Sequence, residues 1–450
     1  MDALLKELAA ITGPEHVLTD PDLTAGYVTD WTRRFRGTAR CVVRPGATAE
    51  VAAVLAACSR QGAPVVTQGG NTGLSGGGVP GRRAAVLLST RRLRRLDPVD
   101  TLSAQVTAGA GVRIAELREH AARAGLQYGV DLASRESATV GGTIATNAGG
   151  VQAVRYGPTR AQLAGLEAVL ADGRVISRLG GIRSDSTGYD LTGLLAGSEG
   201  TLGVITAARL LLRPAEPPTL TVLAGLPSIE AAVALQAEIR ALLPGVRAVE
   251  YFEAAGLALV RAHTGLAAPL GRDYPGYLLV EAAATEIEAE RLMVLAPLSE
   301  AAVALDAQAR ARLWAYRERH TESISAAGIP HKLDVAVPLA RMPAFRADLD
   351  GVLAAAGARA IVFGHIGLGN LHVNVLGPDA DDDRVDHAVL RLAAEHGGTI
   401  SAEHGIGRAK TAVLYLSRSA VEIAVMRAVK SALDPAGILN PDVLFPPGTG

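Results

Sequence analysis

The sequence of 450 residues is poor in cysteine and in aromatic residues, and it has no excess of charge of one sign. Its two cysteines, Cys41 and Cys58, form no Cys-x-x-Cys pair, which argues against a disulfide framework and against a zinc–thiolate site. A reducing compartment fits this usage. Because 44 basic and 45 acidic residues nearly balance and no lysine or arginine block occurs, we do not expect nucleic acid as the main partner.

Long apolar runs are also lacking, and none approaches the roughly 20 residues of a membrane-spanning helix. Near the start of the chain, Asp2, Lys6 and Glu7 interrupt the apolar residues. A signal peptide needs a basic start and an unbroken apolar stretch, so we interpret this segment as a short amphipathic helix. The cytoplasm is therefore the expected location.

The order of sequence patterns predicts an α+β protein with more than one domain. A strand at 41–43, a helix that Thr48 caps and that carries apolar residues at helical spacing up to Cys58, and a strand at 64–66 form one expected strand–helix–strand unit. The prolines of 214–218 interrupt helix and sheet alike and predict a linker. Helical patterns then follow at 228–243, 286–295 and 305–327. The expected segments are 1–35 (helical), 36–214, 215–425, and a turn-rich C-terminal segment, 426–450, that returns toward the earlier domain.

Glycine is abundant, with 50 residues, and it gathers in three stretches at 69–78, 140–150 and 197–203. Glycine lets backbone N–H groups crowd around a phosphate, because no side chain blocks the approach. Three such stretches indicate a long, doubly phosphorylated cofactor held mostly by backbone. A chance origin remains open for each stretch alone, because single glycine motifs are weak signals.

Two common nucleotide signatures are absent. The stretch from Gly109 to Gly111 lacks the third glycine of the dinucleotide fingerprint. Lys410 and Thr411 lack the preceding glycine of a phosphate-binding P-loop. A nicotinamide cofactor is thus disfavoured.

The three glycine stretches resemble the pyrophosphate and isoalloxazine loops of the vanillyl-alcohol-oxidase (PCMH-type) superfamily of FAD enzymes, and the similarity runs from Val42 to Pro441. The resemblance implies a two-part PCMH-type FAD-binding domain at 36–214 and an α+β substrate-binding cap domain with an antiparallel sheet at 215–425. Asn71 stands in the first loop and no histidine is beside it, so FAD is expected to bind non-covalently. The implied cofactor-binding residues are Gln68, Gly69, Gly70, Asn71, Thr72, Gly73, Leu74, Ser137, Gly141, Thr143, Asn147, Gly149, Gly150, Glu199, Ile205 and Asn440.

Two histidines and a carboxylate form a candidate metal site in the second domain. The segment 363–374 (FGHIGLGNLHVN) predicts strand, glycine turn and strand, which brings His365 and His372 to one edge. Glu403 and His404 follow in a glycine-flanked loop. Two imidazoles and one carboxylate leave open positions on a divalent ion, as catalytic sites require. From spacing alone, a structural role for each histidine stays open.

The segments GHIGLGNLHVNV and SAEHGIG resemble the D-2-hydroxy-acid dehydrogenase branch, which contains D-lactate and D-2-hydroxyglutarate dehydrogenases and the glycolate oxidase flavoprotein subunit. The resemblance implies a metal on His365, His372 and Glu403, with zinc first and manganese or iron as alternatives. Leu368 replaces the usual aspartate of the turn. Bound there, the metal would acidify the substrate hydroxyl, His404 would accept its proton, and flavin N5 would accept the hydride.

Candidate anchors for the substrate carboxylate lie between these motifs. Arg317 and Thr321 are one turn apart in the predicted helix, and Lys332 faces away from the aliphatic side of an alternating strand. A solvated helix face is the ordinary alternative. With Asn374, these residues coincide with the substrate residues of the D-2-hydroxyglutarate type. The resemblance thus favours a D-2-hydroxyglutarate-like acid, with D-lactate or D-malate as alternatives.

Two other functions stay open at this point. One is the flavoprotein subunit of a multi-subunit glycolate oxidase, which would need partners for activity. The other is a non-redox flavin enzyme of the same superfamily. The electron acceptor, whether a carrier flavoprotein or a quinone, is also open, and the resemblance implies a homodimer.

Overall fold

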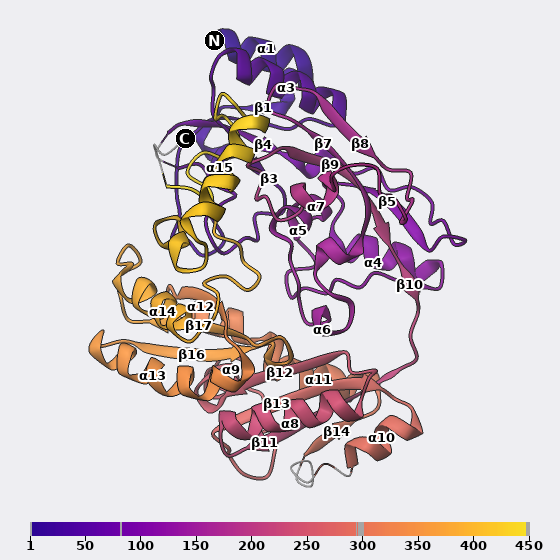
Figure 1. The fold of residues 1–450 in the computed structure, drawn as a ribbon, viewed down its shortest axis with the longest axis vertical. Helices are drawn as coiled ribbons and strands as arrows, with labels where there is room; N and C mark the ends of the chain where they lie inside the picture. Colours follow the sequence, from indigo (N-terminus) through magenta and orange to yellow (C-terminus); the bar gives the residue numbers. More distant parts are fainter. Residues whose placement is uncertain (1, 82, 294, 296–300, 447–450) are drawn as a thin grey trace. The chain divides into compact units, whose positions relative to one another are not determined.

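The computed structural model describes residues 2–81, 83–293, 295 and 301–446. The chain divides into two compact units, labelled by element in Figure 1. Unit 1 comprises Met1–Gly150, Gly157–Ala215 and Glu403–Gly450, and unit 2 comprises Val151–Tyr156 and Glu216–Ala402. The division at 215/216 lies next to the expected linker, whereas the chain returns to unit 1 at Glu403, earlier than the expected residue 426.

The first sheet of unit 1 has the order β1-β2-β4-β3, and β2, β4 and β3 run parallel. These strands are β1 Val17–Leu18, β2 Ala39–Val43, β3 Val65–Gln68 and β4 Ala85–Ser89, accompanied by helices α1 Ala3–Thr12, α2 Pro21–Thr24 and α3 Thr48–Arg60. The predicted strand–helix–strand unit is β2-α3-β3. Residues of α3 at helical spacing, among them Val51, Val54 and Leu55, are fully buried in the core together with Leu4 and Leu8 of α1.

The second sheet of unit 1 is antiparallel, in the order β5-β9-β7-β8. Its strands are β5 Gln105–Gly109, β7 Leu163–Val169, β8 Val175–Arg178 and β9 Val204–Leu211, and β6 Leu126–Gln127 pairs with β10 Arg213–Pro214. The helices of this part are α4 Ile114–Arg123, α5 Val140–Thr146, α7 Leu191–Leu195 and α15 Ala420–Leu433. Ser419 and Glu422 form a capping box at α15.

The C-terminal segment is bonded to the first sheet of unit 1. The N–H of Val65 donates to the carbonyl of Ile438, and the N–H of Asn440 donates to the carbonyl of Val65. The ammonium of Lys430 donates to the carbonyls of Thr201 and Leu439. The turn-rich end of the chain therefore continues the first sheet next to β3.

Unit 2 is built on a seven-stranded antiparallel sheet in the order β14-β11-β13-β12-β16-β17-β15. The strands are β11 Thr219–Leu226, β12 Ala248–Glu253, β13 Gly276–Ala283, β14 Ala302–Ala304, β15 His331–Ala336, β16 Arg359–Gly364 and β17 Asn370–Leu376. The helices are α6 Ala153–Tyr156, α8 Ile229–Leu242, α9 Ala254–Thr264, α10 Glu286–Met293, α11 Ala307–Glu318, α12 His320–Ala327, α13 Met342–Ala355 and α14 Arg384–Glu395. The antiparallel sheet confirms the α+β architecture expected for this half.

Two local expectations were wrong. The single helix predicted over 305–327 is two helices, α11 and α12, which meet at Arg319, so Arg317 and Thr321 stand on different helices. The reason is tertiary packing, because α12 packs mainly on α9, whereas α11 packs on β11, β13 and β14 in addition to α9. Thr48 is not a cap: it is the first residue of α3, and its hydroxyl donates to Glu167.

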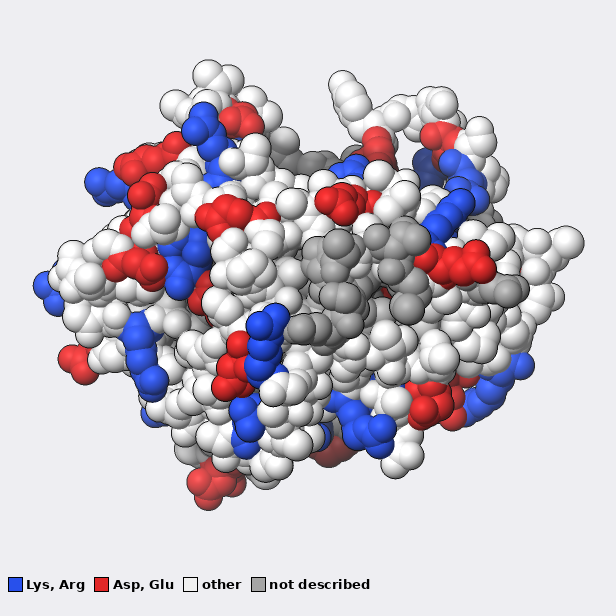
Figure 2. All heavy atoms as spheres, turned by 90° about the horizontal axis from the view of Figure 1, so that it is seen from below, with Lys and Arg blue, Asp and Glu red and all other residues white. Residues whose placement is uncertain are grey.

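Surface charge and hydropathy agree with the composition. On the face in Figure 2, basic and acidic side chains of the described residues are interspersed rather than gathered by sign. Among the residues that the structure describes, no helix combines the length and the apolar character needed to cross a bilayer.

Candidate active site

The first two glycine stretches meet in unit 1 at backbone distance. A Cβ added to Gly70 would stand 2.1 Å from the carbonyl oxygen of Ser137, and one added to Gly69 would stand 2.3 Å from Oγ1 of Thr139. Thr139 in turn caps α5, where its hydroxyl oxygen accepts from the N–H of Gly142. Only glycine fits at 69 and 70, so the loop lies directly against the start of the second stretch.

The third stretch joins the same assembly. The N–H of Glu199 donates to the carbonyl of Ala145 over 2.8 Å. The amide of Asn440 accepts from the N–H of Thr67 (2.8 Å) and donates to the carbonyl of Glu199 (2.6 Å). Asn440 thus holds the end of β3 to the third stretch. This cluster of backbone-rich loops fits a long cofactor that is bound mainly by N–H groups.

Several predicted cofactor residues have side chains that are already hydrogen-bonded to other residues or packed in the core. The amide of Gln68 donates to the carbonyls of Tyr27 and Gly78, the hydroxyl of Thr143 donates to Val140, and Ile205 is buried in the core. Any role of these three in cofactor binding would be through backbone or packing. The remaining predicted positions lie in the same loops or in α5: Asn71, Thr72, Gly73, Leu74, Gly141, Asn147, Gly149 and Gly150.

Glu199 holds the segment that follows His404. Its carboxylate accepts from the N–H groups of Ile406 (2.8 Å) and Gly407 (2.7 Å), and burial raises its pKa. The hydroxyl of Ser75, in the first glycine stretch, donates to the carbonyl of His404 over 3.1 Å. The cofactor loops therefore fix the backbone around the predicted base.

In unit 2, the predicted strand–turn–strand places two imidazoles together. Strand β16 ends at Gly364, a 3₁₀ turn (Ile366–Leu368) follows His365, and β17 carries His372. The ring centroids of His365 and His372 are 5.3 Å apart and the rings are nearly perpendicular, at 85°. Leu368, at the position of the usual aspartate, lies in the turn and is 45% exposed.

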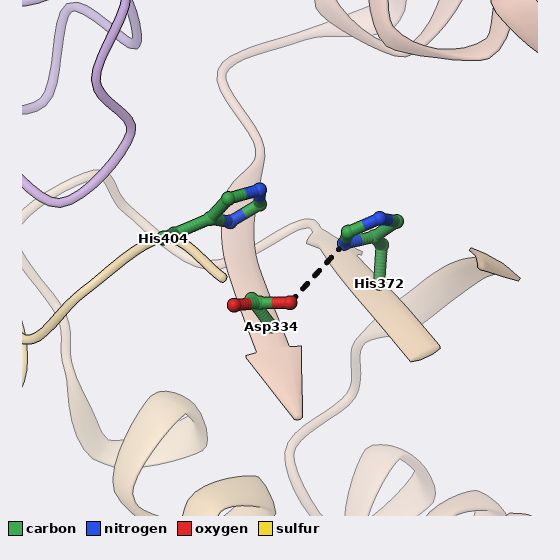
Figure 3. A group of neighbouring side chains, drawn as sticks. All are labelled: Asp334, His372 and His404. Atoms are coloured by element: carbon green, nitrogen blue, oxygen red, sulfur yellow. Dashed lines mark ion pairs between the residues drawn. The ribbon is translucent and has the colours of Figure 1, made fainter. Parts of the chain in front are cut away.

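Each of these imidazoles faces a buried carboxylate through Nδ1. The distance from Nδ1 of His365 to Oε1 of Glu250 is 2.6 Å, and that from Nδ1 of His372 to Oδ1 of Asp334 is 3.5 Å (Figure 3). Glu250 is 1% exposed and Asp334 is fully buried. Histidines that bind metals commonly hold a carboxylate on the second nitrogen, which orients the ring and leaves Nε2 as the ligand.

Sequence reasoning missed both carboxylates. Asp334 had a local signal, because it lies on the Lys332 side of the alternating strand β15. Glu250 had a weaker one, as an acid within the apolar strand β12. Which histidine each of them meets depends on strand order, which neither signal contains.

Glu403 and His404 begin the last segment of unit 1. The carboxylate of Glu403 accepts from the N–H of Gly150 over 3.2 Å. The residue before it, Ala402, belongs to unit 2, and its N–H donates to the carbonyl of Asp334 over 3.4 Å. Glu403 therefore directly follows a residue whose N–H is hydrogen-bonded to the backbone of Asp334.

The predicted substrate residues lie in unit 2, where Arg317 and Asn374 are buried and Thr321 and Lys332 are half-buried. The guanidinium of Arg317 lies 4.5 Å from the ring centroid of Phe363 and forms an ion pair with Glu250, 2.7 Å from Nη2 to Oε2. The ammonium of Lys332 donates to Oδ1 of Asn374 (3.3 Å), its neighbour across β15 and β17. Burial lowers the pKa of Lys332 to about 8. Thr321 is half-buried on α12.

Family comparisons agree with this division of the chain. A model described as FAD binding domain matches residues 39–178, and one described as FAD linked oxidases, C-terminal domain, matches residues 216–444. The chain belongs to the FAD-linked oxidases. FAD is therefore its cofactor, as predicted from the glycine loops.

Among curated relatives, this FAD-linked oxidase is 39% identical over 447 residues to the D-2-hydroxyglutarate dehydrogenase of Xanthomonas citri pv. viticola, covering 95% of this chain and 93% of that protein. It is 36% identical to the mitochondrial D-2-hydroxyglutarate dehydrogenase of Bos taurus, covering 96% and 82%.

Solved structures give the fold. The p-cresol methylhydroxylase with substrate bound has a TM-score of 0.81 at 16% identity, covering 99% of this chain and 97% of that one. The 4-ethylphenol oxidase of Gulosibacter chungangensis has a TM-score of 0.77 at 19% identity, covering 98% and 97%. These likenesses confirm the predicted PCMH-type architecture.

Proposed function

We propose that this FAD-linked oxidase oxidises D-2-hydroxyglutarate, or a closely similar D-2-hydroxy acid, to the 2-oxo acid. The observation that carries the proposal is a pair of cations, the buried Arg317 and the half-buried Lys332, beside the paired imidazoles. Arg317 lies on the ring of Phe363, which is 5.1 Å from the ring of His372, and Lys332 lies on the strand beside that histidine. Arginine binds a carboxylate through paired N–H groups and lysine binds one as a point charge, and a dicarboxylate supplies two negative groups. The names of the curated relatives support the same substrate.

A divalent metal, zinc in the first instance, is proposed on His365, His372 and Glu403. The carboxylates on both Nδ1 atoms support the two imidazole ligands. The bond from Ala402 to Asp334 supports Glu403, because it brings the chain beside His372 immediately before that residue. When bound, the metal supplies Lewis acidity that lowers the pKa of the substrate hydroxyl.

The residues of the chain then have separate tasks. His404 accepts the hydroxyl proton, as an imidazole near neutral pH is suited to do. Arg317 and Lys332 hold the carboxylates, with Asn374 and Thr321 as polar neighbours. FAD, held non-covalently, supplies the acceptor for the hydride from C2. The carboxylate of Glu403 and the backbone around His404 are both fixed by loops of unit 1.

Three expectations about the protein's setting remain proposals as well. They are a cytoplasmic location, a homodimeric state, and reoxidation of the flavin by a carrier flavoprotein or a quinone.

The decisive experiment is anaerobic mixing of the purified protein with D-2-hydroxyglutarate, D-lactate, D-malate or glycolate while flavin absorbance is followed. We expect D-2-hydroxyglutarate to bleach the flavin at the lowest concentration, and its L-enantiomer to leave the flavin oxidised. Reduction by glycolate alone would favour the glycolate oxidase subunit instead. Bleaching that survives a strong chelator at full rate would remove the metal from the proposal.

A further inference from the structure

The carboxylate of Glu250 contacts both a proposed metal ligand, His365, and a proposed substrate cation, Arg317. It lies on β12, next to Tyr251, which pairs with Gly364 of β16 immediately before His365. Its side chain is 1% exposed, and those of His365 and Arg317 are each 8% exposed. The three groups form a row that is closed off from solvent.

Each oxygen of Glu250 serves a different partner. Oε1 lies 2.6 Å from Nδ1 of His365, and Oε2 lies 2.7 Å from Nη2 of Arg317. Arg317 presents only N–H donors, so the oxygen of Glu250 that faces it acts as an acceptor. The other oxygen holds Nδ1 of His365, which orients the ring and leaves Nε2 to face a cation.

The same contact restrains Arg317. The guanidinium is held between the carboxylate of Glu250 on one side and the face of Phe363 on the other. Nε of Arg317 is buried, and within the described part of the chain it has no hydrogen-bond partner. A donor left in this state next to a proposed substrate site is suited to an incoming carboxylate.

We infer that Glu250 is a positioning residue that sets the orientation of His365 toward a divalent cation and that of Arg317 toward a substrate carboxylate. The inference rests on the proposed function. It differs from a purely structural ion pair in its consequence: changes at Glu250 alter metal affinity and substrate affinity together. A structural pair would alter only the stability of the fold.

Glu250→Gln is the informative substitution because it keeps the shape. Glutamine has one oxygen acceptor and one NH₂ donor, whereas His365 and Arg317 both present N–H groups. Whichever way the amide turns, one of the two contacts becomes donor against donor. Glu250→Asp keeps the charge but is shorter by one methylene and reaches only one partner.

The matched control is Glu253→Gln on the same strand. Glu253 also pairs with an arginine, the half-buried Arg346, through contacts of 2.5 and 3.2 Å, but it has no part in the proposed site. Replacing Glu253 therefore removes a carboxylate–arginine pair of β12 without touching His365 or Arg317.

The test uses the FAD-loaded full chain freed of metal by a chelator. Co²⁺ affinity is measured by its absorption spectrum in competition with a chelator, without turnover. Anaerobic flavin reduction on D-2-hydroxyglutarate then gives the half-saturating concentration and the limiting rate separately. FAD content and the urea midpoint report folding.

We expect Glu250→Gln to weaken Co²⁺ binding by about 10- to 100-fold and to raise the half-saturating substrate concentration, while Glu253→Gln leaves both at wild-type values. If Glu250→Gln does not retain FAD, the same two measurements are made on Glu250→Asp, for which we expect smaller losses of Co²⁺ affinity and of substrate affinity. Wild-type Co²⁺ affinity and wild-type half-saturation in a folded Glu250 variant would overturn the inference. A wild-type protein that binds no Co²⁺, or whose flavin no hydroxy acid reduces, would instead refute the proposed function and with it this inference.

Discussion

Replacing Lys332 by methionine is expected to stabilise the protein while it impairs binding of a dicarboxylate. Lys332 lies half-buried on β15, where its ammonium donates to Asn374, and desolvation lowers its pKa from 10.5 to about 8. Because the native pKa lies below the unfolded value, the native state binds fewer protons than the unfolded one. The buried charge therefore costs stability at low pH, and the cost disappears as the pH rises past the unfolded value.

The magnitude follows from the two pKa values. At about 1.4 kcal/mol per pKa unit, the difference between 10.5 and about 8 corresponds to about 3 kcal/mol below the native pKa. Near pH 9.5 the native lysine is already neutral, and its cost to the free energy of unfolding is only about 1.4 kcal/mol. Methionine has a similar length and no charge, so the gain from Lys332→Met should fall from about 3 to about 1.4 kcal/mol between these conditions.

Urea unfolding at about pH 7 and about pH 9.5 measures this gain, with the fluorescence of Trp314 reporting unit 2 in a Trp31→Phe background. The half-saturating concentration of D-2-hydroxyglutarate should rise at least about tenfold, and that of D-lactate much less, because D-lactate has one carboxylate. A gain that is equal at both pH values, or a loss of stability at about pH 7, would refute the reasoning.

Lys430→Met is the contrasting control. Lys430 is half-buried, and it forms an ion pair with Asp434 and donates to the carbonyls of Thr201 and Leu439. The same substitution there leaves a buried carboxylate without its cation and should cost about 3–5 kcal/mol. Opposite signs at the two lysines would tie the effect to the surroundings of each lysine rather than to methionine itself.

Three further outcomes are expected. Gly70→Ala should cost about 2 kcal/mol or more and release most of the FAD on gel filtration, because its Cβ would stand 2.1 Å from the carbonyl oxygen of Ser137; full flavin retention would contradict this close approach. His404→Gln should keep FAD but slow anaerobic flavin reduction about 100-fold or more, and an unchanged rate would exclude His404 as the base. Asp334→Asn should weaken metal binding at His372 about 10- to 100-fold in a chelator competition, unless that carboxylate has no influence on the imidazole.

Local sequence patterns were sufficient to predict much of the fold. The strand–helix–strand unit around α3 and the strand–turn–strand that carries His365 and His372 were predicted from periodicity and glycine positions. Both are short-range features, because side-chain alternation and tight turns depend on neighbouring residues. The break between α11 and α12 was not predictable in this way, since it reflects packing of the two helices against different elements.

The sequence by itself identified the candidate residues: the glycine loops for FAD, the histidines after β16 and on β17, and the cations of α11 and β15. Only the tertiary structure decided which carboxylates meet them. Glu250 reaches His365 because β12 lies beside β16, and Asp334 reaches His372 because β15 lies beside β17. The order of strands in a sheet is a long-range property, fixed by how the whole of unit 2 packs, and no local pattern encodes it.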